Sequence, residues 1–186
     1  MQNNNHIVGT GMYDRFVNYI LPNSKHKLKS EEKHPIIYTK NGFDIPNYLG
    51  PGTNLVHKIK TGVEPVTDVD KTAQAHDIRY HLANSNEDIR KADLKMIDAL
   101  NMVQERGSDY KFNIYTGKLP MLAKMKLEDY GLAKPENFTN FGGVLPENRQ
   151  MMEDKLSALS AQGYGKRKYK NIYLHDQYLR SHRKLS

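Results

Sequence analysis

Two helix-length segments joined by a very short break constrain the fold of this chain more than any other feature. Thr67-Asp68-Val69-Asp70 has the form of a capping box with Asp in place of the usual Glu, and it opens a helix that runs to about Ala83. Asn84-Ser85-Asn86 breaks that helix, and Ser85 or Asn86 caps a second one that ends at Gly107, a left-handed C-terminal cap. So short a connection favours antiparallel neighbours. The sequence therefore predicts a mainly α fold built on two antiparallel core helices.

The inward-facing stripes of these two helices contain polar side chains where a core requires apolar ones. On the first helix, helical spacing selects Val69, Ala73, His76, Asp77, Tyr80 and Ala83. On the second it selects Ile89, Ala92, Asp93, Met96, Leu100 and Val103. Half of the first stripe is polar, and Asp93 is the exception in the second.

The polar residues of the two stripes are expected to lie at one height. Reflecting an antiparallel pair about residue 85 places Asp77 opposite residue 93 and His76 opposite residue 94. Because packed helices lie roughly 8–10 Å apart, side chains from both can meet between their axes, and Tyr80 reaches the same place from one turn away. Solvated polar residues would have no reason to converge in this way.

Buried polar groups must hydrogen-bond to one another or bind a metal or a substrate. An unpaired buried carboxylate or imidazole costs on the order of several kcal/mol. One arrangement has Asp93 accept a hydrogen bond from one nitrogen of His76, which leaves the other nitrogen free as a general base. Tyr80 would hold Asp93 in place through its hydroxyl. Asp77 points about 100° further around the helix, towards a neighbouring element.

The turn Tyr48-Leu49-Gly50-Pro51-Gly52 is the neighbouring element that we expect Asp77 to face. Ca²⁺ takes oxygen ligands, including backbone carbonyls, and glycines allow a tight loop to direct several carbonyls at one point. Tyr48, Gly50 and Gly52 would supply three carbonyls and Asp77 a carboxylate. Such a loop is usually just a turn, and it gains specificity from its place ahead of the His-Asp helix.

At these residues the chain resembles the phospholipase A2 family, and most closely the disulfide-free phospholipase A2-like domain of parvovirus minor capsid proteins and related viral and transposon-encoded proteins. The resemblance covers roughly residues 45–106. The matching motifs are Tyr48-Leu49-Gly50-Pro51-Gly52, Gly62-Val63-Glu64-Pro65-Val66, His76-Asp77-Ile78-Arg79-Tyr80 and Ala92-Asp93.

The resemblance implies a calcium-dependent phospholipase A2 that hydrolyses the sn-2 ester of glycerophospholipids. His76 would activate the attacking water, Asp93 would orient His76, and Tyr80 would support Asp93. Ca²⁺, held by Asp77 and by the carbonyls of Tyr48, Gly50 and Gly52, would stabilise the developing oxyanion. The fold implied is phospholipase A2-like, with the two helices, a calcium loop and a small β-hairpin.

The chain departs from the family in its loop. Secreted members have a loop braced by a disulfide, whereas this chain has Pro51 between two glycines and no cysteine at all. A weaker hold on Ca²⁺ is the expected consequence. The stretch of residues 53–63 is also longer than in the parvoviral proteins that the chain resembles, which leaves the placement of the loop over the site open.

The rest of the chain divides into segments by composition. Residues 107–118 have the alternation of a small hairpin, and 119–132 read as a helix with Pro120 in its first turn. On that helix, Met121, Lys124, Met125 and Lys126 either touch lipid or pack as an ordinary helix surface. The predicted organisation is an amphipathic helix at 1–22, a polar linker at 23–35, a phospholipase A2-like domain at 36–145, a helix at 146–162 and a basic tail at 163–186.

The charge distribution and the N-terminal residues indicate the kinds of partner and compartment that suit this chain. The formal net charge is +7, and the tail 163–186 holds seven Lys/Arg against the single Asp176. Such a tail suits nucleic acid, anionic lipid or an import receptor, or is a solvated end. The first residues lack the pattern of a signal peptide, and no stretch approaches the roughly 18 apolar residues of a membrane span.

Two functions from different classes follow. The first is a phospholipase A2 that acts on a phospholipid membrane surface, breaching a host membrane while a virus enters the cell, in a virion or inside the host cell and in contact with capsid proteins. The second is a catalytically inactive virion protein that binds nucleic acid or membrane through its tail. The intact set of His76, Asp77 and Asp93 favours the first.

Overall fold

The computed structural model describes residues 34–50, 52–134 and 144–163 of the chain. The amphipathic helix predicted at 1–22, the linker at 23–35 except its last two residues, and nearly all of the basic tail lie outside these residues. Those three interpretations, and the domain boundaries with them, therefore stay predictions. Within the described residues, no helix is long and apolar enough to cross a membrane.

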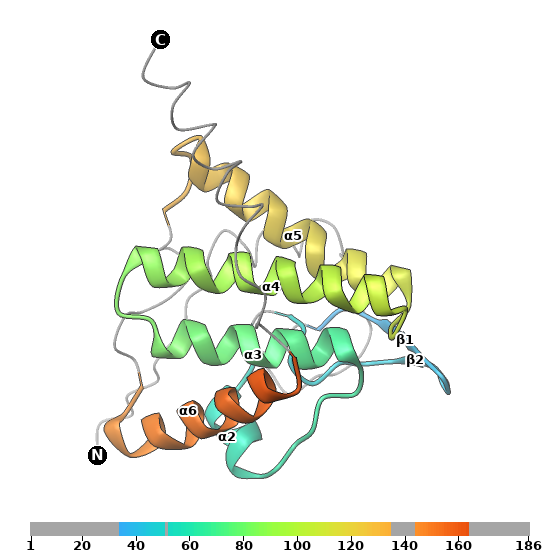
Figure 1. The fold of residues 1–186 in the computed structure, drawn as a ribbon, viewed down its shortest axis with the longest axis horizontal. Coiled ribbons are helices and arrows are strands. Elements are labelled where there is room, and N and C mark those ends of the chain that lie inside the picture. The colour runs from blue at the N-terminus through green and yellow to red at the C-terminus, as the bar shows by residue number, and fades with distance from the viewer. Residues whose placement is uncertain (1–33, 51, 135–143, 164–186) are drawn as a thin grey trace, which may run out of the picture.

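The centre of the fold is the predicted pair of antiparallel helices, α3 (Asp68–Leu82) and α4 (Asn86–Arg106). Thr67 caps α3 by accepting a hydrogen bond from the Asp70 backbone N–H, and Ser85 caps α4 in the same way from Asp88. Gly107 ends α4 in the left-handed conformation. The caps thus confirm the predicted boundaries, and Figure 1 shows the two helices side by side.

Two further helices cover this pair on opposite sides. Helix α5 (Lys111–Asp129) packs on α4 and reaches α3, while α6 (Pro146–Ala161) packs on α3 from the other side (Figure 1). Met152 and Leu159 of α6 belong to the same apolar core as Ile78, Ile89 and Leu100 of the central pair. The predicted helix at 146–162 is confirmed.

A short antiparallel hairpin of β1 (Ile37–Thr39) and β2 (Gly42–Asp44) lies at the end where α4 gives way to α5 (Figure 1). The mainly helical fold with a small hairpin is therefore confirmed. The hairpin's place in the sequence was wrong, because residues 107–118 lead into α5 instead.

Residues 107–118 form a helix start because helical spacing buries their apolar side chains. Ile114 and Gly117 face the core, whereas Phe112 and Tyr115 of the supposed alternation stay exposed. The buried Asn113 bonds the N–H and the carbonyl of Tyr38, both at 2.7 Å, and so ties β1 to α5.

The helix predicted at 119–132 with Pro120 in its first turn is likewise corrected, since Pro120 lies inside α5. The buried stripe continues through Ile114, Gly117, Met121 and Met125 on both sides of the proline. A proline in a helix interior costs about 3 kcal/mol. Burial of this continuous face offsets that cost, so one long helix replaces the two shorter elements expected.

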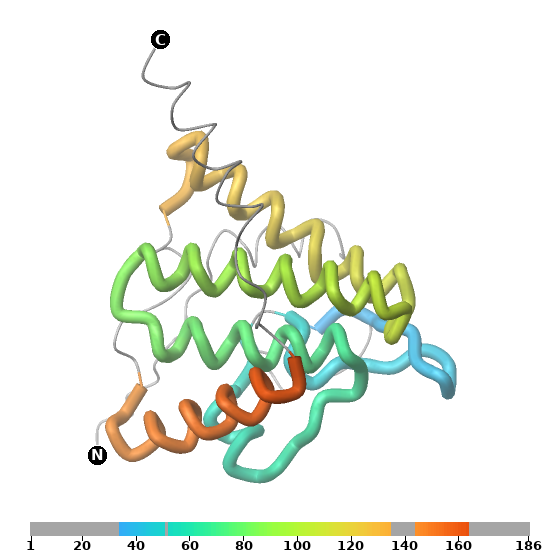
Figure 2. Tube along the Cα trace, in the orientation of Figure 1, coloured from blue at the N-terminus to red at the C-terminus, as the bar shows by residue number. Residues whose placement is uncertain are grey.

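The long stretch after the loop, residues 53–63, forms the short helix α2 (Leu55–Lys60), which packs against α3. Figure 2 follows the chain from the hairpin through the loop and α2 into α3. Leu55 is buried in the core. The extra length is therefore folded against the body of the protein.

Candidate active site

The structure brings His76, Tyr80 and Asp93 together, as the reflection of the helix pair predicts. The Nε2 atom of His76 lies 2.9 Å from Oδ1 of Asp93, and the Tyr80 hydroxyl donates a hydrogen bond to the same oxygen. The ring of Tyr80 also packs on the imidazole, with 4.2 Å between ring centroids. Asp93 is fully buried and His76 nearly so.

The arrangement fixes which nitrogen of His76 carries the proton. An ionised carboxylate can only accept hydrogen bonds, so Nε2 of the neutral ring must be the donor to Asp93. The lone pair then resides on Nδ1, which faces Asp77 with its Oδ1 at 3.5 Å. His76 therefore presents a basic nitrogen away from Asp93 and towards the side of Asp77.

The electrostatics of the cluster favour charge on both partners. Burial alone would lower the pKa of His76, but hydrogen bonds and negative charge from Asp77 and Asp93 outweigh it, so the pKa lies above the ordinary 6.5. Burial alone would raise the pKa of Asp93, yet the His76 hydrogen bond and the Lys124 charge bring it below 3.8. Burial, together with the Asp93 charge, raises the pKa of Tyr80 well above 10, so its hydroxyl stays a donor.

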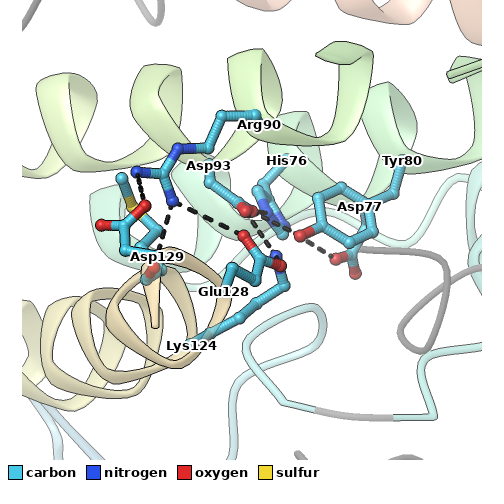
Figure 3. A network of polar contacts seen from close by, with 9 residues as sticks. His76, Asp77, Tyr80, Arg90, Asp93, Lys124, Glu128 and Asp129 are labelled. Atoms are coloured by element: carbon cyan, nitrogen blue, oxygen red, sulfur yellow. Dashed lines mark hydrogen bonds and ion pairs between the residues drawn. The ribbon is translucent and has the colours of Figure 1, made fainter. Parts of the chain in front are cut away.

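A third helix contributes to the site through Lys124 of α5, which the sequence did not assign to the site. Its Nζ lies 2.5 Å from Oδ2 of Asp93 and 2.5 Å from Oε1 of Glu128. Arg90 of α4 continues the network to Glu128 at 3.5 Å and to Asp129 at 2.9 Å (Figure 3). Asp77 lies at the end of the network away from Arg90 and Asp129 (Figure 3).

Lys124 lies among the side chains for which the sequence left two interpretations open. Met121, Lys124 and Met125 are buried, so the packing interpretation holds for them and the lipid interpretation is wrong. The signal that found His76, a polar residue on an apolar helix stripe, applies equally to Lys124. The sequence places Lys124 on a stripe with Met121 and Met125, but it does not show that this stripe packs beside Asp93.

The loop expected to hold Ca²⁺ is anchored by Asp70, the second residue that sequence reasoning missed. Oδ1 of Asp70 accepts the N–H groups of Tyr48 and Leu49 at 2.7 and 2.9 Å, and Oδ2 accepts those of Asn47 and Val66 at 2.9 and 3.0 Å. The sequence analysis had given Asp70 only the reciprocal role in a capping box. Instead, this fully buried carboxylate fastens the loop to α3.

Two further contacts brace the same loop. Lys58 of α2 donates to the carbonyl of Asn47 at 2.6 Å, and the Tyr48 hydroxyl donates to the carbonyl of Val63 at 2.5 Å. Burial above all raises the pKa of Tyr48 to about 12, so its hydroxyl stays a donor. Hydrogen bonds thus hold a loop that has no disulfide.

The donor set of the loop fits a hard, oxygen-preferring cation such as Ca²⁺. The carbonyls of Tyr48 and Gly50 both accept from the Thr53 hydroxyl, at 3.3 and 3.2 Å, so these two oxygens converge. Gly50 and Gly52 have φ of 144° and 82°, which side chains other than glycine rarely allow. Within the described residues there is no cluster of three or more acidic or histidine side chains that could hold a metal. The donors would therefore be mainly backbone carbonyls, with Asp77 as the carboxylate.

Comparison with models of known protein families gives a match. Residues 41–117 match the family model of the phospholipase A2-like domain, from the hairpin turn through the loop, α2, α3 and α4 into α5. No curated protein and no solved structure matches the chain. Lys124, Glu128 and Asp129 lie beyond the matched segment.

The role of Asp70 predicts a large loss of stability when its charge is removed. In Asp70→Asn, an amide N–H₂ would face backbone N–H groups that lose their acceptor, at a cost of about 3 kcal/mol. Urea unfolding followed by circular dichroism measures this. The exposed Asp154, changed to Asn, is the matched control and should leave the unfolding free energy within about 0.5 kcal/mol. Equal stabilities for the two variants would contradict the anchoring role.

The charge balance around His76 predicts its titration in the calcium-free protein. NMR of the imidazole should give a pKa above 6.5, and Asp93→Asn should lower that pKa because it removes the negative partner. With a raised folded-state pKa, ionised His76 adds stability that is fully present below pH 6.5 and is lost as the pH rises through the folded pKa. The exposed His57, changed to Gln, serves to assign the signals. A His76 pKa below 6.5 would show that burial wins instead.

Proposed function

Because residues 41–117 form a phospholipase A2-like domain, we propose that this protein is a calcium-dependent phospholipase A2 that hydrolyses the sn-2 ester of glycerophospholipids. The observation that carries the proposal is the buried His76–Asp93 pair, held at 2.9 Å with the second imidazole nitrogen turned to the side of Asp77. This is the geometry that a general base for water requires. Helices α3 and α4 bring four polar side chains to one level to form this arrangement.

In the proposed reaction, Nδ1 of His76 accepts a proton from water as the water oxygen attacks the ester carbonyl. Asp93 keeps the ring in the Nε2–H form and stabilises the imidazolium that results. The same imidazolium then returns the proton to the departing glycerol oxygen, which leaves a free fatty acid and a lysophospholipid. Tyr80 holds Asp93 through its hydroxyl throughout.

Ca²⁺ would be held by the carbonyls of Tyr48, Gly50 and Gly52 and by the carboxylate of Asp77. When bound there, the ion supplies charge that polarises the ester carbonyl and stabilises the oxyanion. The convergence of the Tyr48 and Gly50 carbonyls supports this assignment. So does the anchoring of the loop by Asp70, which sets its backbone in place before any ion arrives.

We propose a viral setting in which the enzyme breaches a host membrane while a virus enters the cell. The support for this setting is the resemblance of the motifs to the domain of parvovirus minor capsid proteins. The alternative is a virion protein that keeps the fold without activity. The complete set of His76, Asp77, Tyr80 and Asp93 and their mutual contacts favour the enzyme.

The substrate surface would be met by an apolar ridge on the outer side of α5, formed by Phe112, Tyr115, Leu119 and Leu122. These side chains are between 38% and 59% exposed although they repeat at helical spacing. The outer face of a surface helix is ordinarily polar. Exposed lysines, Lys111 and Lys126, stand at the two ends of the ridge. Apolar and aromatic side chains flanked by lysines suit the headgroup region of an anionic bilayer.

The enzymatic proposal is tested by fatty-acid release from phospholipid vesicles that carry a labelled sn-2 chain. Wild type should release the label with Ca²⁺ and not with a chelator, and His76→Gln should lower the rate by about a thousandfold or more because the general base is gone. His57→Gln, on the exposed side of α2, is the matched control with wild-type rate. Release that ignores both calcium and His76 would refute the mechanism, and no release in any condition would favour the inactive virion protein.

The ridge predicts vesicle binding that depends on Leu119 and Leu122. Changing both to Ser should weaken sedimentation with anionic vesicles by about tenfold, since each buried leucine contributes roughly 1.5–3 kcal/mol at full burial and less at an interface. Leu145→Ser, an equally exposed leucine outside the ridge, should bind as wild type. Unchanged vesicle binding would rule out the ridge as the membrane contact. The ridge would also be ruled out if the wild type were a dimer and the double variant a monomer, because the ridge would then be the dimer interface.

A further inference from the structure

The ammonium group of Lys124 occupies a position where an apolar side chain would ordinarily pack. Only 4% of its side chain is exposed, and it lies on the buried stripe of α5 between Met121 and Met125. Taking a lysine and a carboxylate out of water costs on the order of several kcal/mol per ion. Only good geometry of the pair and further hydrogen bonds offset this cost. Methionine fills the neighbouring positions without that cost. Packing alone therefore does not account for a lysine here.

Lys124 supplies the donor to the second oxygen of Asp93. Oδ1 of Asp93 is bonded by His76 and Tyr80, and Oδ2 by Lys124 at 2.5 Å. The three donors come from α3 and α5, and the carboxylate from α4, so the group is held from both sides. Nζ of Lys124 also lies 5.6 Å from the centre of the Tyr80 ring, above the residue that supports Asp93 from the other side.

Lys124 is itself held in place from behind. Glu128, one turn further along α5, lies 2.5 Å from Nζ, and Arg90 of α4 contacts Glu128 and Asp129 (Figure 3). Ion pairs on both sides therefore fix the Lys124 ammonium group beside Asp93.

We propose that Lys124 is a positioning residue for the reaction, which keeps Asp93 ionised and fixed so that His76 adopts the Nε2–H tautomer and presents Nδ1 to water. The expected effect of Lys124 on turnover rests on the proposed function. Its expected effect on the His76 tautomer rests on the geometry alone. Exchange of the acid that orients a catalytic histidine for its amide lowers turnover by about ten-thousandfold in serine proteases, because the wrong tautomer results. Loss of Lys124 acts one step further from the ring, so a smaller effect is expected.

The kinetic test compares Lys124→Met, Lys124→Arg and the matched control Lys91→Met in the vesicle assay with Ca²⁺ present. Lys91 is an exposed lysine of α4 that pairs with Glu87 at the surface. Lys124→Met should lower kcat by about a hundredfold with KM within about threefold, because it disturbs the base and not the binding of lipid. Lys124→Arg should recover at least about tenfold of that loss, and Lys91→Met should match wild type. A Lys124→Met enzyme with unchanged kcat, or no better with arginine, would overturn the proposal.

The second test is independent of activity, so that it separates this inference from the proposed function. Ring ¹⁵N NMR at alkaline pH, where the imidazole is neutral, reports the tautomer of His76, with His76→Gln used for assignment. Wild type should show the proton on Nε2, and Lys124→Met should show a mixture of tautomers. Circular dichroism checks that Lys124→Met is folded. If Lys124→Met does not fold, the His76 spectrum of Lys124→Arg is measured instead. Lys124→Arg should keep the wild-type tautomer. A folded Lys124→Met with an unaltered His76 spectrum would overturn the role of Lys124, whereas an inactive wild type with the expected spectra would overturn only the proposed function.

Discussion

The buried carboxylate of Asp93 is the constraint on which the rest of this structure depends. It lies fully out of water between three helices, and three donors from two of them bond to its two oxygens. An ionised carboxylate at such a place is stable only while those donors stay in place. The spacing of α3, α4 and α5 is therefore tied to the same hydrogen bonds that orient His76. Fold and site are set by one cluster, which explains why apolar stripes on these helices tolerate charged residues.

A second buried carboxylate holds the loop by hydrogen bonds, in a chain that has no disulfide. Asp70 accepts four backbone N–H groups, three of them consecutive from Asn47 to Leu49. Hydrogen bonds to a charged acceptor are among the stronger ones available, and here they are shielded from water. The additional helix α2 brings Lys58 to the carbonyl of Asn47. Hydrogen bonds thus hold this glycine-rich loop in a chain without cysteine.

The sequence was informative wherever a local signal and a packing requirement agreed. Side-chain caps at Thr67 and Ser85 placed the central helices, and the polar residues on their inner stripes predicted the meeting of His76, Tyr80 and Asp93. It failed at residues 107–118, where aromatic residues in alternation suggested strands. Asn113 and Gly117, which decide the helix there, act through contacts with Tyr38 and with side chains of α3, α4 and the loop that no local pattern reveals. That error displaced the start of α5. Lys124 and Asp70 were missed for another reason, since their partners are distant in the sequence.

Helix α5 is unusual because it buries a charged side chain on its inner face and exposes apolar side chains on its outer face. Its inner face buries an ammonium group, and its outer face exposes Phe112, Tyr115, Leu119 and Leu122. Neither feature stabilises an isolated globular domain, since one costs desolvation and the other leaves apolar surface in water. Both are accounted for if the helix joins a membrane on one side to a charged catalytic cluster on the other. The family match ends at Gly117, within this helix, so Lys124 lies beyond the matched residues although it contacts Asp93 inside them.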